Sequence, residues 1–454
     1  MSESTPPIAA VVLAAGKGTR MKSERHKVLH PIAGRAMIDH LLASLKGLGP
    51  ARTVVVVGQG REQLEVHLAG RAEVVVQEPQ LGTAHAVLQA QSGLAGFEGD
   101  VLVLYADVPF VRADTMRAML VRLNESDGPA AVVLGFEPPD TLSYGRVIAS
   151  GDRIAWMVEH KDANDEQRQV GLCNSGLLAA RAGDLFDLLG RVGNDNAQGE
   201  FYLPDIVNIA IGAGRTCAVV TTLDPDEVAG INSRAELAEA EDRWQRGRRR
   251  QAMDEGASLV APETVFFSWD TRIGRDVTVE PNVVFGPGVE VADGAAIHAF
   301  CHIEGARIAG GVSVGPFARL RPGAVLESGA RVGNFVEVKN AVMGAGAKAN
   351  HLTYLGDATV GPGANLGAGT ITCNYDGYFK HQTTIGARAF IGSNSALIAP
   401  VSIGADAIVA AGSAVSRDVA EGELRMVRAE QLVKPGWADR FHDAMKKKKA
   451  AGKE

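Results

Sequence analysis

An aliphatic or aromatic residue returns at every sixth position through most of the C-terminal half of the chain. The first run comprises Ile273, Val279, Phe285, Val291, Ile297 and Ile303, and the last comprises Ile385, Ile391, Leu397, Ile403, Val409 and Val415. A sandwich strand would alternate with a period of two. A period of six is typical of a parallel β-helix, in which three short strands make one triangular coil. Residues 273–415 are therefore predicted to form about eight coils, with compact residues, often glycine, at the corners.

The repeat is interrupted at three places. Its frame shifts by one residue between residues 303 and 308, and it is disturbed again between residues 338 and 360. A longer segment separates the repeats between residues 372 and 385. A β-helix accommodates insertions only as loops on its outside, and such loops often build a binding site. We therefore expect functional residues near these interruptions.

Composition and charge limit the class of protein. A chain of 454 residues is too long for one ordinary core, so two or three domains are expected. The net charge is -7 and no apolar run approaches the roughly 20 residues of a membrane helix, so we expect neither nucleic-acid binding nor membrane insertion. The N-terminal segment MSESTPPIAA lacks the features of a signal peptide, and the four cysteines lie far apart without metal-site spacing. These features predict a cytoplasmic protein with free thiols.

A glycine-rich loop follows the first apolar run of the chain. The buried strand predicted over residues 8–13 leads directly into Ala14-Ala15-Gly16-Lys17-Gly18-Thr19-Arg20-Met21. Its spacing fits neither the P-loop nor the dinucleotide fingerprint, which would need a third glycine at Met21. The loop carries its own cations, Lys17 and Arg20, and Lys27 follows. Taken alone, this pattern fits phosphate binding and an ordinary strand-to-helix turn equally well.

Strands and helices then alternate. Strands are predicted over residues 53–57, 73–77 and 101–105, and helices over residues 61–69 and 84–91, which indicates a mostly parallel sheet with helices on both faces. Asp107 follows the last of these strands, at the edge where such sheets bind ligands. Its carboxylate suits Mg²⁺ bound to phosphates, and it equally suits the cap of a helix that begins near Asp114.

Residues 233–255 are predicted to form one helix, with Leu237, Ala240 and Trp244 on one face. Five arginines belong to this helix: Arg243, Arg246, Arg248, Arg249 and Arg250. Acidic residues surround them and no aromatic residues interleave, so we expect a solvated face and not a nucleic-acid patch.

Several longer motifs occur in order along the chain. They are the glycine loop of residues 13–21, Asn196-Ala197-Gln198-Gly199-Glu200-Phe201-Tyr202, His351-Leu352-Thr353-Tyr354-Leu355-Gly356-Asp357, and Gly367-Ala368-Gly369-Thr370-Ile371-Thr372-Cys373-Asn374-Tyr375-Asp376-Gly377. With them the chain resembles, over nearly its full length, the bacterial bifunctional N-acetylglucosamine-1-phosphate uridylyltransferases/glucosamine-1-phosphate acetyltransferases. The resemblance implies a Rossmann-like α/β nucleotidyltransferase domain (residues 1–230), a linker helix (231–255), a left-handed parallel β-helix acetyltransferase domain (256–430) and a C-terminal tail (431–454).

The resemblance also implies the residues of the uridylyltransferase site. The uridine nucleotide and the sugar would contact Leu13, Ala14, Ala15, Gly16, Lys27, Gln77, Gly82, Thr83, Tyr105, Ala106, Asp107, Gly145, Glu159, Asn174 and Asn232. Arg20 and Lys27 would face the triphosphate of UTP as catalytic cations, and Asp107 and Asn232 would hold Mg²⁺. This family usually has Tyr-Gly-Asp where the chain has Tyr105-Ala106-Asp107, so the Ala106 methyl is expected to tighten or shift the sugar pocket without abolishing activity.

In the β-helix, His351 is implied to be the general base, because histidine titrates nearest neutral pH. Glucosamine 1-phosphate would contact Arg321, Lys339, Tyr354, Asn365 and Lys380, and acetyl-CoA would contact Ala368, Asn374, Tyr375, Ser393, Ala411 and Arg428. A homotrimer through the flat β-helix faces is expected, with residues 431–437 folding over a neighbouring subunit.

Two other interpretations remain at this point. In the first, the chain is a nucleotidyltransferase whose β-helix is a regulatory or oligomerising domain, as in glucose-1-phosphate adenylyltransferases. A bare scaffold, however, needs neither the external loop nor the polar cluster at residues 351–354. An assembly subunit without activity would be expected to lose the glycine loop or Asp107, and both are present.

Overall fold

The computed structural model describes residues 6–141 and 143–452, so the first five residues of the N-terminal segment and the last two of the tail lie outside it. The chain divides into two compact units, Met1–Gly247 and Arg248–Glu454. The division falls inside helix α8 (Arg234–Asp254), and the domain limits given above remain predictions. Among the described helices, none combines the length and the apolar character that crossing a membrane requires.

The N-terminal unit is built on a nine-stranded sheet in the order β5-β4-β1-β6-β10-β7-β11-β9-β8. Its strands are β1 (Ile8–Ala14), β4 (Arg52–Val57), β5 (Glu73–Val76), β6 (Asp100–Tyr105), β7 (Ala131–Phe136), β8 (Arg146–Ser150), β9 (Arg153–Val158), β10 (Cys173–Arg181) and β11 (Ala218–Thr222). The strands β5, β4, β1 and β6 are parallel, whereas β10 is antiparallel to both of its neighbours β6 and β7. A small hairpin, β2 (Pro31–Ile32) and β3 (Arg35–Ala36), lies outside this sheet. Because β4 and β6 lie on opposite sides of β1, the strand order reverses at β1, as at the ligand sites of other open α/β sheets.

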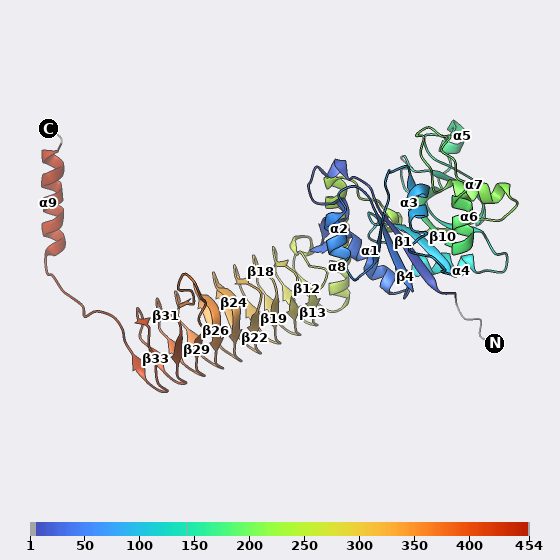
Figure 1. Ribbon diagram of the computed structural model, residues 1–454. Coiled ribbons are helices and arrows are strands. Elements are labelled where there is room, and N and C mark those ends of the chain that lie inside the picture. The colour runs from blue at the N-terminus through green and yellow to red at the C-terminus, as the bar shows by residue number, and fades with distance from the viewer. Residues whose placement is uncertain (1–5, 142, 453–454) are drawn as a thin grey trace, which may run out of the picture. The chain divides into compact units, whose positions relative to one another are not determined.

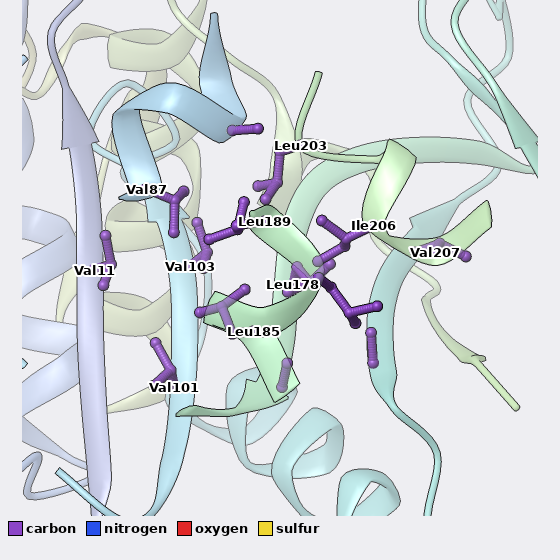
Figure 2. Packing of buried hydrophobic residues seen from close by; sticks show 14 of the residues in the cluster. Val11, Val87, Val101, Val103, Leu178, Leu185, Leu189, Leu203, Ile206 and Val207 are labelled. Atoms are coloured by element: carbon purple, nitrogen blue, oxygen red, sulfur yellow. The ribbon is translucent and has the colours of Figure 1, made fainter. Parts of the chain in front are cut away.

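Helices cover both faces of this sheet. They are α1 (Met37–Lys46), α2 (Glu62–Leu68), α3 (Thr83–Gln89), α4 (Ala113–Leu123), α5 (Asp165–Arg168), α6 (Ala182–Leu189) and α7 (Asp205–Gly212). Side chains of a strand alternate between the faces, so Val11 packs in one core and Val12 in the other. Figure 2 shows the first core, where Val11 and Val103 of the sheet meet Leu189 of α6 and Val87 of α3. The predicted strands and helices agree with the observed ones to within two residues.

Helix α8 confirms the helix predicted over residues 233–255. Leu237, Ala240 and Trp244 pack together against Met37 and Ile231, as their spacing predicts. The prediction that all five arginines are solvated is wrong for Arg248 and Arg249, whose side chains are largely buried.

Arg249 is only 6% exposed and donates from Nε to the Val265 carbonyl at 2.8 Å. The guanidinium of Arg248 lies over the Phe267 ring, 5.2 Å from its centroid. These two arginines therefore fasten the end of α8 to the first turns of the C-terminal unit, because their flat guanidinium groups stack on aromatic rings.

The C-terminal unit is a parallel β-helix (Figure 1) with three strand-bearing faces. The first face holds β12 (Ser258–Leu259), β14 (Thr278–Val279), β17 (Ala296–Ile297), β20 (Ser313–Val314), β23 (Arg331–Asn334), β25 (Lys348–His351), β27 (Asn365–Leu366), β30 (Phe390–Ile391), β33 (Ile408–Val409) and β35 (Leu424–Arg425). The second holds β13 (Arg272–Ile273), β16 (Glu290–Val291), β19 (Ala306–Ile308), β22 (Ala324–Leu326), β29 (Thr383–Ile385) and β32 (Val401–Ile403). The third holds β15 (Val284–Phe285), β18 (His302–Ile303), β21 (Arg319–Leu320), β28 (Ile371–Cys373), β31 (Ala396–Ile398) and β34 (Ala414–Val415). The longer strands β24 (Glu337–Met343) and β26 (Tyr354–Val360) belong to both the second and the third face.

The pairing register explains the interruptions of the repeat. Val284 pairs with His302, a full coil of three hexads later, whereas His302 pairs with Arg319, one residue short of a full coil. Ile371 pairs with Ala396, because residues 374–382 form the external loop predicted from the sequence. The aliphatic positions of the repeat point inward: Val279, Ile297 and Ile303 have no exposed surface.

The corners are compact in some places and not in others. A Cβ on Gly392 would lie 2.4 Å from the backbone nitrogen of Ala411 in the next coil, so glycine is required there by close approach. At another corner the prediction of small residues is wrong. Phe300, Phe317 and Phe335 have φ values of 62°, 56° and 56°, and their rings stack at 4.9 and 5.2 Å. We call these three residues the aromatic ladder; about half of each side chain is exposed.

The last helix among the described residues is α9 (Trp437–Ala451), which contains four consecutive lysines at residues 446–449 and has no buried residue.

Candidate active sites

A cavity of about 310 Å³ opens at the carboxyl ends of β1, β5 and β6 in the N-terminal unit. It is lined by ten of the residues predicted for the nucleotide site: Leu13, Ala14, Ala15, Gly16, Lys27, Gln77, Gly82, Thr83, Tyr105 and Asp107. The parallel strands end at the same edge of the sheet, so residues far apart in sequence meet there.

The loop that carries Gly82 and Thr83 is clamped by the segment containing Phe201. Gly82 has φ +117°, and a Cβ there would lie 2.5 Å from the Phe201 carbonyl oxygen, so only glycine fits. The Ala84 N–H donates to that carbonyl at 2.9 Å, and the Leu203 N–H donates to Thr83 Oγ1 at 2.9 Å. The specific motif at residues 196–202 therefore shapes one wall of the cavity.

A cationic centre at Lys27 forms part of the cavity lining. Lys27 Nζ is 2.5 Å from Asp107 Oδ2 and 3.1 Å from Asn232 Oδ1, and the Lys27 side chain is only 10% exposed. The backbone N–H of Asn232 donates to Glu236 Oε2 at 2.5 Å, which fixes the start of α8 beside the site. Two oxygen ligands from distant segments thus converge on a single positive charge.

The sugar end predicted from Gly145, Glu159 and Asn174 forms one contiguous group. The Asn174 N–H donates to the Gly145 carbonyl at 2.9 Å, and a Cβ on Gly145 would lie 3.3 Å from both carboxylate oxygens of Glu159. Burial, followed by the nearby charges of Asp205 and Asp162, raises the pKa of Glu159. This group lies outside the lining of the 310 Å³ cavity.

Tyr105 connects the sugar group to the cavity. It lines the cavity, and its pKa is raised mainly by burial and then by the charge of Glu159. A Cβ on Gly176, two residues after Asn174, would lie 2.8 Å from the Tyr105 ring, so Tyr105 packs beside the segment that carries Asn174.

Two predicted residues point elsewhere. Ala106 directly follows β6, is fully buried in the core cluster that includes Val12 and Leu104, and is outside the cavity lining. Its methyl group therefore lies away from the cavity. Arg20 lies in the short 3-10 helix Thr19–Met21, is exposed, and is outside the cavity lining.

Two polar residues of the cavity were not predicted. Gln80 lines it and donates from Nε2 to the Ala15 carbonyl, which holds the glycine loop in place. Glu200 also lines it, and the sequence offered a signal in its position within the specific motif at residues 196–202.

In the β-helix, His351 ends strand β25 at the edge of the first face. Its Nδ1 lies 2.6 Å from Oδ1 of Asn334, the equivalent residue one coil earlier. Because a carboxamide oxygen only accepts, Nδ1 carries the proton and Nε2 presents a lone pair. Asn334 was not predicted; its signal was a polar residue 17 positions before His351, in register with it.

The residues predicted for acetyl-CoA continue from His351 along the same edge. Backbone bonds stack the coils there: Gly369 N–H donates to the Leu352 carbonyl at 3.1 Å, Asn394 N–H to the Ala368 carbonyl at 2.8 Å, and Gly412 N–H to the Ser393 carbonyl at 2.8 Å. The resulting column is His351, Ala368, Ser393 and Ala411, one from each successive coil. Arg428 donates from Nη1 to the Ala411 carbonyl at 2.9 Å, so it lies at the end of this column.

The predicted phosphate ligands come from three segments: Arg321 follows β21, Lys339 lies on β24, and Lys380 lies on the external loop. Arg321 donates from Nη1 to Glu337 Oε1 at 2.9 Å, and Glu337 pairs with Tyr354 on the next coil. Contact with the Lys380 ammonium lowers the pKa of Lys339. Two ammonium groups held together favour an anion between them.

The external loop is a hairpin held by internal hydrogen bonds. Asp376 accepts from the Phe379 N–H at 2.7 Å and from His381 Nε2 at 2.7 Å, and these bonds hold its pKa well below the usual range. Tyr375 pairs with Lys380 across the hairpin.

Two predicted residues remain: Asn374 lies at the base of the hairpin, and Asn365 lies on the first face of the β-helix. Asn374 donates from Nδ2 to Asp357 Oδ2 at 2.5 Å. Asn365 lies on β27, the strand that follows His351's strand on the first face.

Comparison with known proteins agrees with both units. The family model for the MobA-like NTP transferase domain matches residues 10–155. The models for the bacterial transferase hexapeptide (six repeats) and for the hexapeptide repeat of succinyl-transferase match residues 270–305 and 382–417. The predicted fold class, a nucleotidyltransferase domain followed by a hexapeptide β-helix, is confirmed.

Curated relatives match the chain along nearly its whole length. The chain is 74% identical over 445 residues to the bifunctional protein GlmU of Sphingopyxis alaskensis, covering 98% of each chain. It is 75% identical over 447 residues to that of Novosphingobium aromaticivorans, covering 98% of this chain and 99% of the relative. The Zymomonas mobilis protein of the same name is 55% identical over 446 residues, covering 97% of this chain and 99% of the relative. The resemblance seen in the motifs is therefore confirmed: the chain belongs to the bifunctional GlmU family.

Proposed function

We infer that the chain catalyses two successive steps. Its C-terminal unit transfers the acetyl group of acetyl-CoA to glucosamine 1-phosphate, and its N-terminal unit transfers UMP from UTP to the resulting N-acetylglucosamine 1-phosphate. The products are UDP-N-acetylglucosamine and pyrophosphate. The observation that carries this conclusion is the match to bifunctional relatives over 98% of the chain, which spans both polar sites.

Uridylyl transfer is an in-line displacement. An oxygen of the sugar 1-phosphate attacks the α-phosphorus of UTP, and pyrophosphate leaves. We propose that Gln77, Gly82 and Thr83 hold uridine, while Gly145, Glu159 and Asn174 hold the acetylated sugar. Lys27 lines the cavity and would neutralise charge at the phosphates. Positioning and charge neutralisation account for most of the rate in such reactions. Arg20, which is exposed, would meet the outer phosphates.

The residues present also fit a bound Mg²⁺. Oδ2 of Asp107 and Oδ1 of Asn232 already converge on the ammonium of Lys27 at 2.5 and 3.1 Å, so the same two oxygens suit a hard cation. Clusters of three His, Cys, Asp or Glu side chains with metal geometry are absent from residues 6–141 and 143–452. Such a site takes its other ligands from phosphates and water. When bound, Mg²⁺ would neutralise phosphate charge.

Acetyl transfer needs a base and an anchored acceptor. The Nε2 lone pair of His351 takes a proton from the 2-amino group of glucosamine 1-phosphate as its nitrogen attacks the thioester carbonyl. The C–N bond forms, the C–S bond breaks, and CoA leaves as the thiol. Arg321, Lys339 and Lys380 would bind the phosphate, and Tyr354 and Asn365 the sugar hydroxyls.

Acetyl-CoA would lie along the column of Ala368, Ser393 and Ala411, because small side chains there leave room beside His351. Asn374 and Tyr375 would border it at the hairpin, and Arg428 at the far end of the column.

A homotrimer is proposed as the assembled form. The aromatic ladder stacks three rings that are 51%, 45% and 56% exposed, at positive φ, a conformation that costs bulky residues energy. A ladder of this kind gains stability when another copy of the chain covers it. The proposed location is the cytoplasm, where the four cysteines stay free.

The two activities are separable by mutation. Asp107→Ala is expected to abolish pyrophosphate release from UTP and to leave thiol release from acetyl-CoA unchanged, whereas His351→Ala is expected to do the reverse. Loss of both activities from either single variant, in a sample that stays folded, would contradict two independent sites.

A further inference from the structure

The Gln77 carboxamide is held in one orientation from behind. Gln77 follows β5, is 4% exposed, and lines the nucleotide cavity. Its Nε2 donates to the Gly82 carbonyl at 2.9 Å and is 3.1 Å from Nδ1 of His85. Both N–H groups of the carboxamide are therefore used on the protein side.

The orientation of this carboxamide determines what it presents to a ligand. A carboxamide has a donor end and an acceptor end, and fixing Nε2 on the protein side leaves Oε1 as an acceptor for the cavity. Rotation by half a turn would place Oε1 against two other acceptors, the Gly82 carbonyl and His85 Nδ1, and this arrangement is repulsive.

His85 contacts the cavity residue Gln77 but does not itself line the cavity. It lies on α3 and is half-buried. Because Nε2 of Gln77 is held on the Gly82 carbonyl, its contact with His85 makes the ring Nδ1 the acceptor. Nε2 of Gln89 donates to the His85 carbonyl at 3.1 Å and lies 3.2 Å from the other ring nitrogen.

We propose that His85 is a positioning residue for base selection, which locks the Gln77 carboxamide so that the cavity accepts a pyrimidine with an N–H at ring position 3 and rejects one with a lone pair there. Uracil carries that N–H, whereas cytosine presents an acceptor at the same edge. A site built to hydrogen-bond one edge rejects a base that leaves the bond unmade. This inference rests on the proposed uridylyltransferase function of the cavity.

The test compares UTP and CTP as substrates with N-acetylglucosamine 1-phosphate, by pyrophosphate release. In His85→Leu the carboxamide loses one of its two anchors, and we expect KM for UTP to rise about tenfold with kcat little changed. The ratio of kcat/KM for UTP over CTP should fall by about tenfold, because the rotated carboxamide can donate to cytosine. The matched control His67→Leu removes a histidine bound to Asp39, outside the cavity lining, and should leave the ratio unchanged.

Conservative variants guard against a simple loss of folding. His85→Asn keeps an acceptor near the position of Nδ1 and should preserve the wild-type ratio, whereas His85→Gln places its polar group farther out and should resemble His85→Leu. The inference is overturned if the UTP/CTP ratio stays within twofold of wild type in His85→Leu, or if the Asn and Gln variants discriminate equally. A wild-type enzyme that turns over neither nucleotide would overturn the proposed function itself, and with it this inference.

Discussion

The hydrogen bond between Asn334 and His351 provides a quantitative test of the acetyltransferase mechanism. Asn334→Ala removes the acceptor 2.6 Å from His351 Nδ1 and leaves the rest of the coil in place. The imidazole then loses the partner that keeps its lone pair on Nε2 and that stabilises the imidazolium as the proton arrives.

The magnitude follows from the setting of this bond. A hydrogen bond to a group that becomes charged contributes about 1.5–3 kcal/mol, and the exposed position of His351 argues for the low end. A loss of about 1.5 kcal/mol corresponds to about a tenfold fall in kcat for acetyl transfer. His351→Ala, which removes the base itself, should cost about a hundredfold or more.

The assay is thiol release from acetyl-CoA at saturating glucosamine 1-phosphate, across a pH series. Asn334→Asp restores an acceptor with a negative charge, so it should recover the rate and move the rising limb of the pH profile to higher pH, because a carboxylate raises the pKa of a neighbouring histidine. Pyrophosphate release from UTP serves as the internal control. A kcat for Asn334→Ala within twofold of wild type at every pH would refute the assignment of Asn334.

Three further perturbations address the rest of the chain. Gly82→Ala forces φ +117° on alanine and sets its Cβ 2.5 Å from the Phe201 carbonyl oxygen. We therefore expect thermal melting to show a loss of about 1–3 kcal/mol in the free energy of unfolding, and pyrophosphate release to show a raised KM for UTP. An unchanged melting temperature would show that the cavity wall formed by Phe201 can move. Chelation of Mg²⁺ by EDTA should stop pyrophosphate release while thiol release continues, and equal loss of both would count against a metal confined to the N-terminal site. Leu397→Ala, at a fully buried position of the β-helix, should lower the free energy of unfolding by about 2–5 kcal/mol. The temperature at which acetyl transfer is lost should fall, and the temperature at which uridylyl transfer is lost should fall less. An equal fall for both activities would mean that the two units unfold together.

The six-residue repeat made much of the C-terminal fold predictable. An aliphatic residue at every sixth position, such as Val279 or Ile297, marks the side chains that point into the β-helix, and both of these are fully buried. The external loop was predictable because a longer segment separates the repeats between residues 372 and 385. The aromatic ladder was not predictable by the same reasoning, because a phenylalanine at φ 56° violates the local preference for glycine, and only contacts between coils reveal its stacking.

The candidate sites show a similar limit. Asp107 and His351 were candidates because of their residue types and positions, and the family resemblance added Gly82. Asn334 and Gln80 escaped because their roles depend on neighbours in space: one pairs with His351 across coils and the other fastens the Ala15 carbonyl. Ala106 shows the reverse case: it departs from a family motif, but its methyl group lies in the core and its effect depends on packing that the motif does not reveal.

The most direct test of the bifunctional account is thiol release from acetyl-CoA with glucosamine 1-phosphate as acceptor and no UTP present. We predict release that requires this sugar phosphate, is lost in His351→Ala and is retained in Asp107→Ala. No release from a folded sample that still turns over UTP would contradict the account and leave the β-helix as a scaffold for a nucleotidyltransferase.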